Sequence, residues 1–140
     1  MFGFDFLGFG NRRKWALQAF DRALDEFEVN RAYVDDGMRY AVYKWALVEE
    51  GRIAPADFGA LDRIMREAAA FISFCVLGAA ETEELWGAES RAQRQAQFDA
   101  ALARGDEETL EVKLIKLVLA KGVAAPDIRA QVSLETEDQS

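Results

Sequence analysis

The stretch Pro55–Leu77 decides the fold, and it reads PADFGALDRIMREAAAFISFCVL. Its apolar residues recur at steps of three and four, the spacing of one helix face: Phe58, Leu61, Met65, Ala68, Ile72 and Cys75. In its first half, charged residues occupy the opposite, solvent-facing side. In its second half, that side carries Phe71, Phe74 and Leu77 instead. A helix that is apolar all round must be buried. We therefore predict the central helix here, with residues 71–77 in the core or at a subunit contact.

Upstream of this helix, residues 12–50 keep the same rhythm and leave two interpretations open. Apolar residues recur at helical spacing both before and after residue 30. One helix over this span would be about 58 Å long, which is large for a domain of this size. Asp35-Asp36-Gly37 resembles a break followed by a helix start. We favour two helices, with a bend or break between Asn30 and Gly37.

The second of these helices carries an additional apolar row. Tyr33, Tyr40 and Leu47 repeat every seven residues, roughly opposite the row from Val34 to Val48. A helix that is apolar on two faces is either sandwiched within its own domain or shared with a partner. We place these three residues among the candidate partner-binding residues.

Downstream, the sequence predicts three further helical segments and no strand. Thr82 is a candidate N-cap for a solvated helix that ends near Arg104, and Lys121-Gly122 closes the next one. Pro126 begins a short helix through Val132. The predicted fold class is all-α, a compact bundle of about five helices. It comprises a single domain over residues 12–132 and a loose acidic tail over residues 133–140.

The first eleven residues, MFGFDFLGFGN, predict a flexible aromatic arm rather than a helix, because three glycines interrupt them. Three interpretations remain open: the arm fills a groove on its own domain, docks into a partner, or touches a membrane with help from the basic residues 12–14. Membrane contact is the least favoured of the three. The candidate partner-binding residues of this arm are Phe2, Phe4, Phe6, Leu7 and Phe9.

The residue types present argue against catalysis. The 140 residues include no histidine and one cysteine, which removes the commonest general base and the commonest metal ligands. No glycine-rich phosphate loop occurs either. We predict no catalytic, cofactor-binding or metal residues, and interpret Cys75 as a buried apolar residue. The protein is predicted not to be an enzyme.

The net charge of −8 argues against binding to nucleic acid, which requires clustered basic residues. No apolar segment is long enough to span a bilayer and no secretory signal opens the chain, so we expect a cytoplasmic protein. The leading hypothesis is a non-enzymatic interaction protein, such as an adaptor, assembly factor or regulatory subunit. Its partner would be another protein or a second copy in a homodimer.

The alternative hypothesis is an acidic decoy that mimics nucleic acid and inhibits a basic protein, as some phage proteins do. It rests on the glutamates of residues 81–84 and 107–111. We favour the simpler interpretation that these side chains stabilise helix N-termini.

Overall fold

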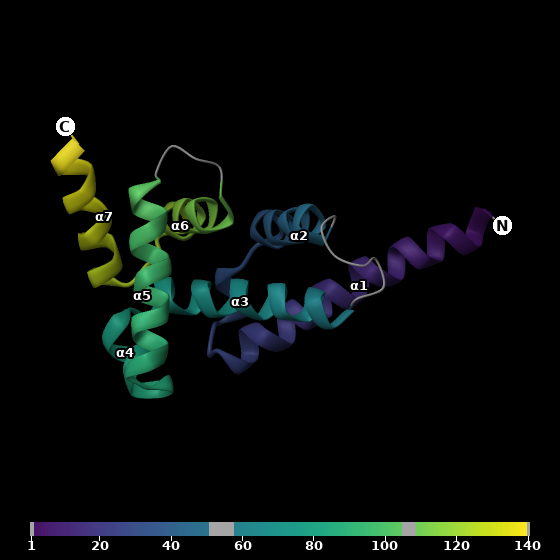
Figure 1. The fold of residues 1–140 in the computed structure, drawn as a ribbon, viewed down its shortest axis with the longest axis horizontal. Helices are drawn as coiled ribbons and strands as arrows, with labels where there is room; N and C mark the ends of the chain where they lie inside the picture. The colour runs from purple at the N-terminus through teal and green to yellow at the C-terminus, as the bar shows by residue number, and fades with distance from the viewer. Residues whose placement is uncertain (1, 51–57, 105–108, 140) are drawn as a thin grey trace. The chain divides into compact units, whose positions relative to one another are not determined.

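The computed structural model describes the backbone of residues 2–50, 58–104 and 109–139, and the side chains of residues 14–45, 59–104 and 109–133. Of the described residues 86% are helical and none is in a strand, which confirms the all-α prediction (Figure 1). The described helices number seven where about five were expected: α1 (Phe2–Glu26), α2 (Asp36–Glu50), α3 (Phe58–Leu77), α4 (Ala79–Trp86), α5 (Ala88–Ala103), α6 (Leu110–Lys121) and α7 (Pro126–Gln139). A short 3₁₀ helix, η1, spans Arg31–Tyr33.

The chain divides into two compact units, Met1–Ala69 and Ala70–Ser140. Helix α3 contributes to both, because residues 58–69 belong to the first unit and residues 70–77 to the second. The sequence predicted a single domain over residues 12–132, and each unit is described by itself below.

Helix α1 of the first unit begins at Phe2, so the backbone of residues 2–11 is helical. This corrects the expectation that the first eleven residues form a flexible arm rather than a helix. The physical reason is cooperativity: once residues 12–26 are helical, each added residue needs only a propagation step and no new nucleus. Glycines at about 1 kcal/mol each weaken such an extension without forbidding it.

A break separates α1 from α2, as the sequence favoured, although it begins at Phe27 rather than after Asn30. Glu28 has a left-handed backbone (φ 62°), which turns the chain away from the helix. Asn30 caps η1 by accepting a hydrogen bond from the Ala32 amide at 2.9 Å. Asp35 caps α2 in the same way, accepting from the Met38 amide at 2.9 Å. The two short polar side chains therefore fix where the second helix starts.

The core of the first unit is built from the predicted rows. Its buried residues include Ala16, Phe20 and Leu24 of α1, Met38, Ala41 and Val42 of α2, and Leu61, Met65 and Ala68 of α3. Arg66 of α3 ties this core to the end of α1, because its Nη1 lies 2.6 Å from Glu26 Oε2 and its guanidinium lies 5.4 Å from the Phe27 ring centre. A cation at that position also favours the carbonyl end of α1, which has no basic residue in its own last turn.

The second unit begins with the buried end of α3. Phe71, Ile72, Phe74 and Cys75 are all at most 1% exposed, which confirms the predicted core, whereas Leu77 is only half-buried. Leu77 is the last residue of α3, where the helix leaves the core. Phe74 packs against Phe98 of α5, with 6.0 Å between ring centres. Leu114 and Val118 of α6 complete the apolar centre.

Two glycines make the corners of this unit. Gly78 (φ 93°, ψ 171°) separates α3 from α4, and Gly87 (φ 96°, ψ 168°) separates α4 from α5. Residues with a side chain essentially never adopt this backbone conformation. Gly87 splits what the sequence predicted as one helix, so that α4 packs along α5, which also packs against α6 (Figure 1). The additional corner raises the helix count above the predicted number.

Two further expectations about the second unit need correction. Thr82 does not cap a helix; it lies inside α4, where its buried hydroxyl donates to the Gly78 carbonyl at 2.7 Å. Helix α7 runs to Gln139, seven residues beyond the predicted end at Val132, so residues 133–139 are helical rather than a loose tail. The predicted closing glycine is confirmed, since Gly122 caps α6 in a left-handed conformation.

Candidate interaction surface

Tyr40 is the most exposed of the large apolar side chains in the described part of the chain. It lies on α2 and is 61% exposed, while Met38, Ala41 and Val42 on the opposite side of the same helix are buried. Lys44, four residues on, is also exposed. Helical spacing puts Leu47 in the same row, although its side chain lies outside the described residues. One predicted binding residue is therefore placed at the surface, and a second shares its row.

Tyr33 does not belong to this row. It lies in η1, before α2 begins, and is 37% exposed. The predicted seven-residue repeat from Tyr33 through Tyr40 to Leu47 assumed that all three residues lie in the second helix. The break after α1 removes that register, because Asp35 restarts the helix downstream of Tyr33. Tyr33 and Tyr40 are both exposed aromatic residues, but they stand on different elements.

Charged pairs flank these tyrosines and hold their elements in place. Arg39 Nη2 lies 2.7 Å from Asp21 Oδ1 and joins α2 to α1; both side chains are only 23% exposed. The contact is an ion pair rather than a well-directed hydrogen bond. Arg31 holds Asp25 through two contacts, Nε–Oδ1 at 3.0 Å and Nη2–Oδ2 at 2.5 Å. The Arg31 hydrogen bond lowers the pKa of Asp25, so this pair stays charged down to acidic pH.

Trp15 is an exposed aromatic residue that sequence reasoning missed. It lies on α1, is 42% exposed, and the Arg22 guanidinium stands 5.8 Å from its ring centre. Cation–π contacts of this kind keep a tryptophan ring fixed at a wet surface. Trp15 precedes the apolar row that starts at Ala16 and is spaced seven residues from Arg22, but this pattern does not by itself indicate exposure, which depends on how α1 packs.

The five N-terminal candidates share one helix. The structure places Phe2, Phe4, Phe6, Leu7 and Phe9 on the first turns of α1, and their side chains lie outside the described residues. In a helix, alternate residues such as Phe2, Phe4 and Phe6 do not all share one side. Their role in binding stays a prediction.

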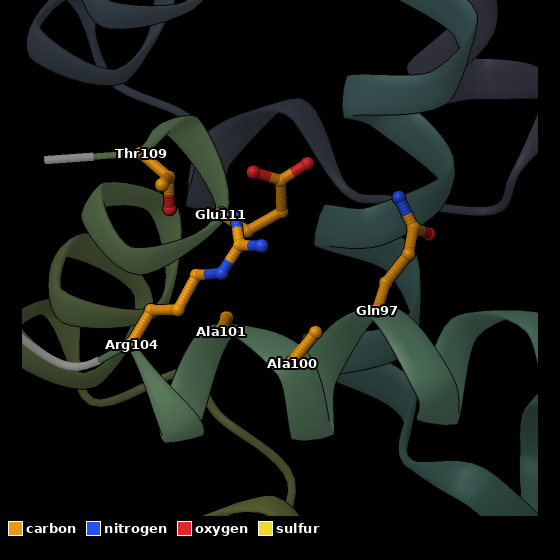
Figure 2. Close-up of a pocket in the computed structure, with 6 residues that line it drawn as sticks. All are labelled: Gln97, Ala100, Ala101, Arg104, Thr109 and Glu111. Atoms are coloured by element: carbon orange, nitrogen blue, oxygen red, sulfur yellow. The ribbon is translucent and has the colours of Figure 1, made fainter. Parts of the chain in front are cut away.

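A pocket of about 190 Å³ lies between α5 and the start of α6 in the second unit. Figure 2 shows its lining: Gln97, Ala100, Ala101 and Arg104 from the end of α5, with Thr109 and Glu111 opposite. The Thr109 hydroxyl already accepts a hydrogen bond from the Val112 amide at 3.2 Å, as the N-cap of α6. Pockets for drug-sized ligands are usually larger, at about 300–1,000 Å³. The pocket brings together none of the predicted binding residues.

Cys75 is buried, as predicted, and unpaired. Burial raises the pKa of its thiol, so it is held in the neutral, unreactive form.

Over residues 2–50, 58–104 and 109–139, no group of three or more acidic, cysteine or histidine side chains is arranged to hold a metal ion. In the same residues, no helix has both the length and the apolar character needed to cross a bilayer.

The acidic segment at residues 81–84 is partly engaged within the protein. Glu83 forms an ion pair with Arg91 of α5 at 2.8 Å, and Glu81 stands in the first turn of α4. The position of Glu81 agrees with the interpretation that these side chains stabilise a helix N-terminus, whereas Glu83 contacts the next helix instead. The second predicted cluster, residues 107–111, lies mostly outside the described residues.

The chain matches no protein-family model, no curated protein and no solved structure.

Proposed function

We propose that this protein is a non-enzymatic helical interaction protein, an adaptor, assembly factor or regulatory subunit, that binds another protein. Its contact surface is centred on the exposed face of α2 and extends to the phenylalanine-rich start of α1. The observation that carries the proposal is the 61% exposure of Tyr40 on a helix whose opposite side is buried.

Tyrosine suits such a role because its ring supplies a large apolar contact while the hydroxyl tolerates water in the free state. The helix that carries Tyr40 is fixed by buried residues at positions 38, 41 and 42 and by the Arg39–Asp21 ion pair to α1. A rigid anchor loses little conformational entropy on binding, and more of its contact energy is retained in the complex.

The non-enzymatic part of the proposal is supported by the residue content. The absence of histidine removes the usual acid–base group. The one cysteine is buried, and burial raises its thiol pKa, which does not suit a nucleophile.

Affinity capture from the native host tests the proposal when wild type is compared with Tyr40→Ser and with Leu85→Ser. Leu85 is a matched control, an exposed apolar residue on α4 of the other unit with 46% exposure. A partner that binds through α2 is lost with Tyr40→Ser and retained with Leu85→Ser. Sedimentation of the three purified proteins detects the homodimer version, in which Tyr40→Ser alone weakens self-association.

The proposal fails if both variants capture the same proteins as wild type and all three remain monomeric. Deleting residues 1–10 tests the N-terminal part separately: the proposal predicts weaker capture with an unchanged melting temperature. A large fall in melting temperature would instead show that these residues pack within their own unit. A different result would favour the acidic decoy: a basic partner that the Tyr40→Ser and deletion variants still capture, but that is lost as the salt concentration rises.

A further inference from the structure

The chain that follows α6 and forms the first half of α7 is attached to the rest of the second unit chiefly through residues near the start of α7. Ala124, Ala125 and Ile128 are at most 6% exposed. From Arg129 to Ser133 the described side chains are exposed or half-buried. The apolar attachment is therefore concentrated in about one helical turn. We call residues 124–133 the strap.

Two backbone-directed hydrogen bonds fasten the same end. The Ala125 amide donates to the Cys75 carbonyl at 2.9 Å, and so joins the strap to the last turn of α3. The Ala79 amide donates to Asp127 Oδ2 at 2.9 Å. That amide belongs to the first residue of α4, whose N-cap is a glycine and supplies no side-chain cap. Asp127 thus caps a helix 48 residues away in the sequence.

The Asp127 carboxylate stands where two helix N-termini come together. It caps α4 and also lies in the first turn of its own helix, α7. Both helix dipoles favour a negative charge there. Gly78 makes this approach feasible: a Cβ at that position would lie 2.5 Å from Asp127 Oδ1 and 3.1 Å from Ala125 Cβ. The Asp127 carboxylate fits beside this corner because Gly78 has no side chain.

We propose that the strap is a releasable latch, fastened at the Asp127–Ala79 contact, whose opening exposes the end of α3 around Cys75 while the rest of the second unit stays folded. Most of the buried contacts of the strap lie in one cluster near the start of α7, so breaking this cluster removes its main attachment in one step. The Gln95–Gln131 hydrogen bond at 2.8 Å is farther along α7 and joins two partly exposed side chains. It adds little resistance once the latch has opened.

Cys75 reports this opening directly, because it is the one cysteine of the chain and is fully buried when the latch is closed. Its labelling by an aromatic disulfide reagent is measured under native conditions for wild type, Asp127→Ala and Thr109→Ala. Thr109→Ala is the matched control, since it removes an N-cap from α6 in the same unit away from the strap. We expect Asp127→Ala, which removes the acceptor for the Ala79 amide, to accelerate labelling about tenfold and Thr109→Ala to change it less than about twofold.

The latch is overturned if Asp127→Ala leaves the labelling rate unchanged, or if both variants accelerate it in proportion to the stability each loses. The second result would mean that Cys75 is reached only by global unfolding. Hydrogen exchange of the wild-type protein gives an independent test that needs no variant. The Ala79 and Ala125 amides should exchange together, at a rate insensitive to low urea and at least about tenfold faster than the Leu114 and Val118 amides. Equal rates in all four amides would contradict the latch.

Discussion

The two corners of the second unit have nearly the same backbone and very different surroundings. Gly78 and Gly87 share φ near 95° and ψ near 170°, and each ends one helix and begins the next. A Cβ at position 78 would collide with Asp127, whereas nothing lies within 4 Å of a Cβ at position 87. The backbone explains why each residue is glycine. The environment decides how much a substitution should cost.

The largest expected effect is at Gly78, the corner where an added Cβ would meet Asp127. Gly78→Ala adds backbone strain of about 1–3 kcal/mol and also pushes Asp127 away from the Ala79 amide, which costs about 0.5–2 kcal/mol more. We expect the free energy of unfolding, measured by urea titration, to fall by about 1.5–5 kcal/mol. In an Asp127→Ala background the cap is already absent, so the same substitution should cost less, through the backbone strain and the close approach to Ala125. Equal costs in both backgrounds would show that Gly78 and Asp127 are not coupled.

A substitution at Gly87, the corner with no neighbour within 4 Å of an added Cβ, should cost only the backbone strain. Gly87→Ala is expected to lower the free energy of unfolding by about 1–3 kcal/mol, because a side chain there meets no neighbour but the backbone still needs a positive φ. The same urea titration measures it. A loss as large as that of Gly78→Ala would remove the distinction between the corners.

The two caps of this unit should have smaller and similar effects on equilibrium stability. Asp127→Ala and Thr109→Ala each remove one helix N-cap, so each should lower the melting temperature through a loss of about 0.5–2 kcal/mol. Calorimetry on both proteins compares them. If Asp127→Ala were neutral, the cap would contribute nothing and the difference between the corners would have to come from Ala125 alone.

The smallest effect is expected away from both corners. Tyr40→Ser should change the free energy of unfolding by less than about 0.5 kcal/mol, because the side chain is mostly in water. Thermal melts of wild type and variant measure this. A loss above about 1 kcal/mol would mean that Tyr40 supports its own unit and is a poor candidate for a binding residue.

Local patterns predicted the all-helical fold class and the buried core. The apolar run around Phe71 and Phe74 identified the buried end of α3, and Asp35 identified the start of α2, because both signals lie within a few residues of their effect. Gly122 predicted the end of α6 for the same reason.

Features set by distant contacts were not predictable. A single glycine inside a helical pattern costs only about 1 kcal/mol, so the sequence around Gly87 did not distinguish a corner from a continuous helix. Thr82 looked like the local cap of α4, whereas the actual cap, Asp127, comes from another helix. Of the candidate site, Tyr40 was found from its spacing. Trp15 was missed because its exposure depends on how α1 packs.

The Asp127–Ala79 contact also orders events during protein synthesis. Helix α4 leaves the ribosome well before its cap does, because 48 residues separate the donor from the acceptor. At about 5–20 residues per second, roughly 2–10 s pass before Asp127 has been added to the chain. During that interval the first amide of α4 has only water to bind. The second unit therefore reaches its finished state only after Asp127 has been translated.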